Sequence, residues 1–67
     1  MLMRSPELFL MQGKKKLSEG NYESAIDFLA SARYLLPKDE EKIHHQIYLN
    51  LGIAFFNKEN YNDALEN

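Results

Sequence analysis

The feature of this chain that most constrains its fold is an internal repeat with a spacing of 39 residues. Large and small residues recur in the same order in both copies. A fixed period of about 20–50 residues is typical of stacked supersecondary units, none of which can bury its apolar face alone. The repeat therefore predicts helices that pack side by side. The matching pairs are Phe9 and Tyr48, Gly13 and Gly52, Leu17 and Phe56, Asn21 and Asn60, Tyr22 and Tyr61, Ala25 and Ala64, and Ile26 and Leu65.

Length and composition limit how such a chain can be stabilised. Its 67 residues can bury one small core, and chains of this size often depend on disulfides, a metal or a second subunit. The sequence has no cysteine, which excludes disulfides and thiolate metal sites. A formal net charge of -2 does not indicate nucleic acid or an anionic membrane as partner. The apolar run from Leu8 to Met11 is too short for a signal sequence or a membrane span, so we expect a cytoplasmic protein.

Capping residues divide the chain into helices. Ser5 and Pro6 have the form of a helix start, and the first helix is expected to run to about residue 18 or 19. Gly20 then supplies the left-handed residue that ends it, and Asn21 caps a second helix. Pro37 ends this second helix, because the residue before a proline avoids the helical region. The result is a hairpin of two antiparallel helices.

A third helix is predicted to begin after Asp39 as its cap and to continue to about Asn57. Asn60 then caps a fourth helix, which at about two turns is too short to be stable alone. The predicted fold class is therefore all-α, with a helix-turn-helix hairpin, a long third helix and a short C-terminal stub.

The order of large and small residues resembles the tetratricopeptide repeat, a family of helix-turn-helix units of about 34 residues. On that pattern the chain is one domain, with a first repeat over 6–39, an insertion over 40–44 and a partial second repeat over 45–67. The resemblance implies a truncated α-solenoid that belongs to a longer array. It assigns repeat packing to Phe9, Gly13, Tyr22, Ala25, Leu29, Ala32, Tyr48, Leu51, Gly52, Phe55 and Ala64.

In this family the first helices of successive repeats line a concave groove that holds an extended or helical peptide. The resemblance therefore implies a protein or peptide partner, recognised by apolar anchors more than by charge. Members that hold a terminal carboxylate use lysine and asparagine at set positions, of which only Asn50 matches here. The implied groove consists of Leu10, Lys14, Leu17, Leu49, Asn50, Ile53, Phe56 and Asn57, together with Glu7, Ser18 and Gln46.

The predicted third helix is apolar on almost every side, although only two other complete helices are available to cover it. Ile47 and Leu51 lie on one stripe, and Leu49, Ile53 and Phe56 lie on another. Each large side chain left in water forgoes about 1.5–3 kcal/mol, a heavy loss for a small domain. We therefore expect a homo-oligomer, either a symmetric dimer or an exchange of helices.

Two functional hypotheses follow from this apolar surface. The first is a protein-interaction or assembly module that binds through the concave face. The alternative is the structural end segment of a solenoid, whose main role is self-association. Pattern alone supports both equally, because a partner groove and a packing face have the same composition.

Residues that carry chemistry are sparse, and we expect neither an enzyme nor a cofactor. The chain has no glycine-rich phosphate loop and no serine in a recognisable context with histidine and carboxylate. His44 and His45 are adjacent and diverge by about 100° on a helix, which favours a surface turn over a metal site. Lys14, Lys15 and Lys16 fan around their helix, which indicates a solvated helix end and not a nucleic-acid site.

Overall fold

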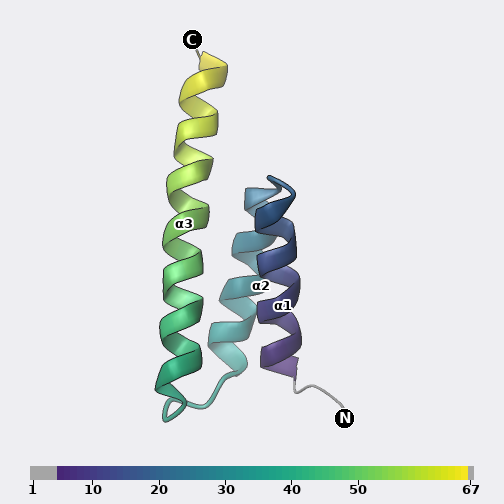
Figure 1. The fold of residues 1–67 in the computed structure, drawn as a ribbon, viewed down its shortest axis with the longest axis vertical. Helices are drawn as coiled ribbons and strands as arrows, with labels where there is room; N and C mark the ends of the chain where they lie inside the picture. Colours follow the sequence, from purple (N-terminus) through teal and green to yellow (C-terminus); the bar gives the residue numbers. More distant parts are fainter. Residues whose placement is uncertain (1–4, 67) are drawn as a thin grey trace.

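The computed structural model describes residues 5–66, which form three helices and no strand. Helix α1 (Ser5–Ser18) and helix α2 (Tyr22–Leu35) make the antiparallel hairpin, and α3 (Glu41–Glu66) packs against α2. Figure 1 shows that α3 extends well past the end of the hairpin, which gives the molecule its elongated extents of 45 × 21 × 14 Å. The predicted all-α fold, a hairpin followed by a long third helix, is confirmed. Asn67, which closes the expected second repeat, lies outside the described residues.

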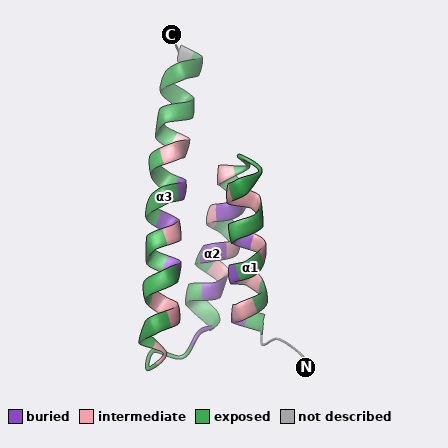
Figure 2. Ribbon diagram, in the orientation of Figure 1, coloured by how far each residue is buried: buried purple, intermediate pink, exposed green. Residues whose placement is uncertain are grey.

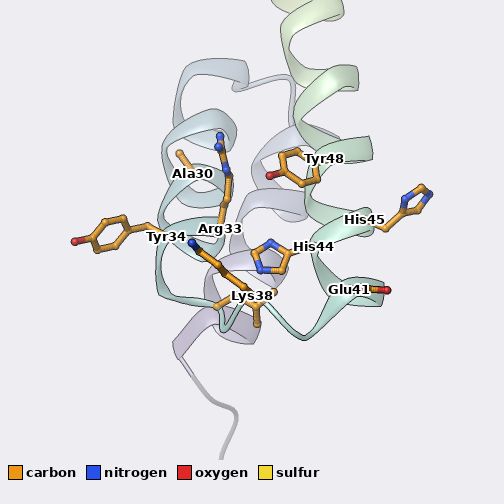
Figure 3. Close-up of a pocket in the computed structure, with 9 residues that line it drawn as sticks. Ala30, Arg33, Tyr34, Lys38, Glu41, His44, His45 and Tyr48 are labelled. Atoms are coloured by element: carbon orange, nitrogen blue, oxygen red, sulfur yellow. The ribbon is translucent and has the colours of Figure 1, made fainter.

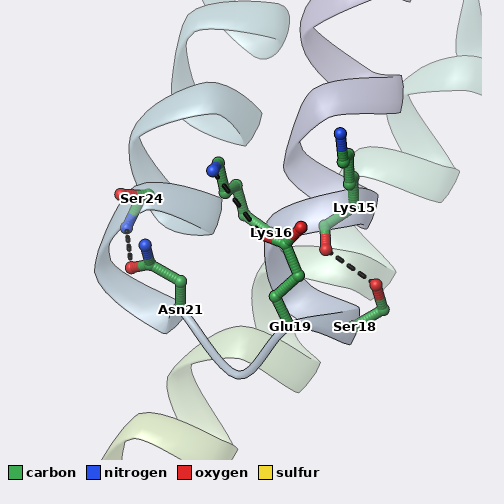
Figure 4. A network of polar contacts seen from close by, with 6 residues as sticks. All are labelled: Lys15, Lys16, Ser18, Glu19, Asn21 and Ser24. Carbon is green, nitrogen blue, oxygen red and sulfur yellow. Dashed lines mark hydrogen bonds and ion pairs between the residues drawn. The ribbon is translucent and has the colours of Figure 1, made fainter.

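The turn between α1 and α2 forms where the capping residues predict it. Gly20 has a φ of 80°, and the Asn21 side chain accepts a hydrogen bond from the Ser24 amide at 3.4 Å. Figure 4 shows this cap beside a second one, in which the Ser18 hydroxyl donates to the Lys15 carbonyl at 2.7 Å. The Asn21 bond occupies an amide that the start of a helix leaves without a partner, whereas the Lys15 carbonyl also accepts from the Glu19 amide at 3.1 Å.

Replacing Gly20 with alanine is expected to lower the free energy of unfolding by about 1–2 kcal/mol, because an L-residue is strained in the left-handed region. No atom lies within 4 Å of the added methyl group, so the effect is purely conformational. Gly52 is a matched control, since the same substitution there enters open space inside a helix and should raise stability by about 0.5–1 kcal/mol. Urea unfolding of both variants measures the two effects, and changes of equal sign would contradict this account.

The connection from α2 to α3 is set by Pro37. Leu36 is extended, with φ -80° and ψ 132°, as expected for a residue that precedes proline. A turn follows, in which the Glu40 amide donates to the Pro37 carbonyl at 3.2 Å. The Glu40 carbonyl then accepts the first α3 bond, from the His44 amide at 3.1 Å. Glu40 and not Asp39 is thus the N-cap residue, and the predicted cap was one residue early.

The predicted break near Asn60 is wrong, because α3 is continuous to Glu66 and there is no separate stub. The repeat itself gives the reason. The counterpart of Gly20 in the second copy is Glu59, which costs about 1–2 kcal/mol in the left-handed region but is a good helix former. The segment after Glu59, which corresponds to the start of α2, therefore continues in line with α3.

The core lies between α2 and its two neighbours (Figure 2). Gly13 allows α1 and α2 to approach closely, since a methyl group on it would lie 2.7 Å from Cγ of Leu29. Phe9 and Phe28 add a ring contact with centroids 6.1 Å apart at the same interface. The buried hydrophobic residues are Leu10, Ala25, Leu29, Ala32, Leu36, Ile47, Leu51 and Ala54.

The residues assigned to repeat packing divide into two groups. Those of the first copy lie in the hairpin interface, buried or half-buried, and Leu51 joins them from α3. Tyr48, Gly52, Phe55 and Ala64 are exposed instead. Within residues 5–66 no helix covers Tyr48, Gly52 and Phe55, because the segment that corresponds to α2, which includes Ala64, continues α3.

Candidate interaction surfaces

A groove of about 370 Å³ runs between α1 and α3, on the side predicted to be concave. It brings together four of the residues implied by the resemblance, and it adds Met11 and Ile43, which the sequence reasoning did not assign to it. Leu10 needs a correction, because it is only 8% exposed and belongs to the core, so a partner cannot use it as an anchor. The groove is lined by Glu7, Leu10, Met11, Lys14, Ile43 and Gln46.

The apolar half of the predicted groove lies farther out on α3 and does not line this cavity. Leu49 is 61% exposed, Ile53 is 41% exposed and Phe56 is 65% exposed. No other element of the described chain covers them. Leu17 is half-buried in the last turn of α1 and also lies outside the groove lining. The structure thus divides the predicted site into a groove and a neighbouring apolar stripe.

Asn50 and Asn57 are both bonded to their own helix. The Asn50 Nδ2 donates to the Gln46 carbonyl at 2.7 Å, and the Asn57 Nδ2 donates to the Ile53 carbonyl at 2.9 Å. These bonds use amide N–H groups and fix the side chains along the helix. The Oδ1 atoms keep their acceptor capacity, which suits the backbone N–H groups of a bound segment.

A larger cavity, of about 830 Å³, lies on the other side of α3, against α2 (Figure 3). Its wall includes Arg33, whose guanidinium lies 5.3 Å from the centroid of the Tyr48 ring, and His44, whose ring stacks on Tyr48 at 6.3 Å. Sequence reasoning missed this cavity because its residues come from two helices whose relative rotation is set by packing. The available signal was a set of basic residues and histidines between Arg33 and His45, with Tyr34 and Tyr48 near the two ends of the segment.

The two histidines do not act together. The His44 Nε2 donates to the Pro37 carbonyl at 3.0 Å, which fixes the connection before α3. His45 points away from His44 in Figure 3. Over residues 5–66, no group of three or more histidine, aspartate or glutamate side chains is arranged to hold a metal ion.

Charged side chains mark the surface near the hairpin turn. Lys16, in the last turn of α1, pairs with Glu19, the residue that follows the helix, at 3.5 Å (Figure 4). Lys58 of α3 pairs with Glu23 of α2, also at 3.5 Å. Both pairs are partly exposed and contribute little to stability. The second pair nevertheless shows that α3 runs beside α2 as far as Lys58. Beyond Lys58, the apolar side chains of Tyr61 and Leu65 are exposed.

None of the helices in the described part of the chain has the length and hydropathy needed to cross a bilayer. Comparison with known proteins finds no family model that matches, no similar curated protein and no similar solved structure.

Proposed function

We propose that this chain is a protein-interaction module, a tetratricopeptide-like hairpin extended by one long helix, which binds a peptide or helix of a partner protein. The partner lies along the α1–α3 side of the molecule. The single observation that supports this most strongly is the exposure of Leu49 and Ile53, large apolar side chains one turn apart, beside an open groove. No catalytic role is proposed.

The chemistry of this side suits an amphipathic partner. Leu49 and Ile53 offer an apolar centre, and the oxygens of Asn50 and Asn57 offer acceptors at its edge. An apolar core with a polar rim is the usual composition of a protein interface. Burying each apolar side chain contributes about 1.5–3 kcal/mol, so a few anchors give useful affinity. Apolar anchors spaced at i and i+4 on a partner helix would match this spacing.

Replacing Ile53 with glutamate tests the proposal. Peptides selected from a random library against the wild-type chain should bind the Ile53→Glu variant at least tenfold more weakly in calorimetric titrations, because the new charge loses its hydration in the interface. Helicity and the urea midpoint should stay unchanged, since Ile53 contributes little to the core. Tyr34→Glu is the matched control, at a residue 88% exposed on α2, and should bind normally. Equal loss in both variants, or in neither, would contradict the proposed face.

The alternative is a structural end segment whose main role is self-association. The protrusion of α3 beyond the hairpin supports it, because Tyr61 and Leu65 are exposed there and neither α1 nor α2 extends that far. Under this alternative, Ile53→Glu lowers helicity or dissociates an oligomer, and no peptide is bound at that face. Circular dichroism and light scattering on the same variant therefore separate the two functions.

A further inference from the structure

The outward side of α3 carries a set of residues whose spacing is symmetric about Gly52. Large apolar side chains lie three and four residues before this glycine, and others lie three and four residues after it. A histidine stands seven residues before it, and a glutamate stands seven residues after it. We call this set the symmetric face, and its members are His45, Tyr48, Leu49, Gly52, Phe55, Phe56 and Glu59.

The symmetric face points away from the hairpin. At about 100° per residue, Gly52 lies roughly 140–160° around α3 from Ile47 and Ala54, which are fully buried. Figure 2 shows the outward side of α3 as exposed, and no atom lies within 4 Å of a methyl group placed on Gly52. Within residues 5–66, no helix covers this face. The exposed fractions of its large side chains are 52% for Tyr48, 61% for Leu49, 54% for Phe55 and 65% for Phe56.

The hairpin of this chain already uses a glycine to bring two helices close together. Gly13 is the residue of the first repeat that corresponds to Gly52. A methyl group on Gly13 would lie 2.7 Å from Cγ of Leu29 and 3.4 Å from the Ala25 carbonyl oxygen, so α1 and α2 approach closely there. Gly52 faces open space and can admit a helix in the same way.

We infer that a second molecule of this protein occupies the symmetric face, with the two α3 helices antiparallel about a two-fold axis at Gly52. Such a pair brings residues before the axis against residues after it, so a face with symmetric spacing is complementary to itself. Leu49 and Phe56 are about two turns apart on one flank of the face, and each lies beside the other from the second molecule. Tyr48 and Phe55 pair in the same way on the other flank, and the two glycines meet at the centre.

The charges at the two ends of the face set the direction of the pair. In the antiparallel arrangement, His45 of each molecule faces Glu59 of the other. An imidazole N–H can donate to a carboxylate oxygen whether the ring is neutral or charged. In a parallel pair Glu59 would face Glu59, and like charges in contact oppose association. The antiparallel direction is therefore the complementary one.

The area of this interface is sufficient for a specific pair. Each of the four large side chains is half-exposed or more in the single chain. Each offers roughly 100 Å², so the symmetric pair buries on the order of 1,000 Å². Because this area is near the lower limit for specific interfaces, we expect a dimer that dissociates on dilution.

The inferred pairing goes beyond the proposed partner site and uses a neighbouring face of α3. Ile53 lies about 100° around the helix from Gly52, and Asn57 lies about 140° from it, both on the side of the α1–α3 groove. Leu49 lies at the border and belongs to both faces. The dimer therefore leaves Ile53 and Asn57 accessible to a partner peptide.

A charge at the two-fold axis tests the symmetric face. Gly52→Glu enters open space in the single chain but places two carboxylates against each other in the pair, so the dimer dissociation constant should rise at least about tenfold. Helicity should stay the same or rise, because glutamate is a better helix former than glycine. Gln46→Glu adds the same charge at an exposed position outside the symmetric face and should remain dimeric. Sedimentation equilibrium of the full chain measures both variants.

A wild-type chain that is monomeric at every concentration, or a dimer that responds equally to both substitutions, would overturn the inference. Either result would leave the proposed partner site standing, because peptide titrations of Ile53→Glu test it separately.

A charge exchange tests the antiparallel direction. His45→Glu places a carboxylate opposite Glu59 at both ends of the pair and should weaken the dimer at least about tenfold. The double variant His45→Glu with Glu59→Lys restores unlike charges and should recover most of the wild-type affinity. In a parallel pair the double variant would bring like charges together at both positions and would not recover. Sedimentation equilibrium distinguishes the two outcomes, and a double variant as weak as His45→Glu alone would overturn the antiparallel pair.

Discussion

Replacing Leu29 with alanine is expected to lower the free energy of unfolding by about 3 kcal/mol, within the range of 2–5 kcal/mol typical of large-to-small core changes. Leu29 is fully buried in α2, and it contacts the face of α1 around Gly13. Its removal leaves a cavity at the place where the two hairpin helices approach most closely. Urea unfolding followed by circular dichroism measures the loss, and a change below 1 kcal/mol would contradict this central role.

A double-mutant cycle with Gly13 makes this prediction more specific. Gly13→Ala alone should be destabilising by about 1–3 kcal/mol, because its methyl group would overlap Cγ of Leu29. In a chain that already carries Leu29→Ala, the same methyl group has room. The loss of stability in the double mutant should therefore be smaller than the sum of the losses in the two single mutants. The expected coupling energy is about 1 kcal/mol or more. If the two losses are additive, the overlap between the methyl group of Gly13→Ala and Leu29 is relieved by a shift elsewhere in the structure.

Replacing Ile47 with alanine is the second large effect, with an expected loss of about 2–4 kcal/mol. Ile47 is fully buried and is the largest side chain with which α3 enters the core. The substitution weakens the docking of α3 on the hairpin and leaves the α1–α2 interface intact. Ile53→Ala is the matched control, because it removes the same atoms from a side chain that is already 41% exposed on the same helix.

The measurement should distinguish undocking of α3 from global unfolding. Hydrogen exchange in Ile47→Ala should accelerate throughout α3 and remain slower in α1 and α2. The Ile53→Ala control should lose less than 1 kcal/mol and keep the wild-type exchange pattern. Equal losses in the two variants would mean that the core described between α2 and α3 does not form.

Much of this fold is predictable from local sequence signals. Gly20, Asn21 and Pro37 determine three boundaries through backbone chemistry that depends little on distant residues, and the structure agrees with each. Helical spacing also identified Ile47 and Leu51 as one stripe of α3, and the structure buries both. Signals of this kind succeed because a φ restriction or a missing N–H acts at the residue that carries it.

The errors have an equally physical origin. Asn60 is a good cap only if the chain turns before it, and Glu59 opposes that turn, so the helix continues. The preference of Asn60 for a capping position can be read from the sequence, but whether Asn60 caps a helix depends on residue 59. Leu10 was assigned to a binding face because the repeat pattern does not show how deeply α1 sits between its neighbours. Cavities such as that around Arg33 and Tyr48 depend on the rotation of one helix against another, which no local signal specifies.

The contrast between Gly20 and Glu59 has a consequence for how such a chain can change over generations. Codons for glycine and glutamate can differ by a single base, and the two residues lead to opposite shapes at equivalent points of the repeat. One point mutation therefore separates a unit that closes on itself from one that projects a helix outward. In a family of repeated sequences, that small genetic step would be enough to convert an inward-facing surface into an outward-facing one.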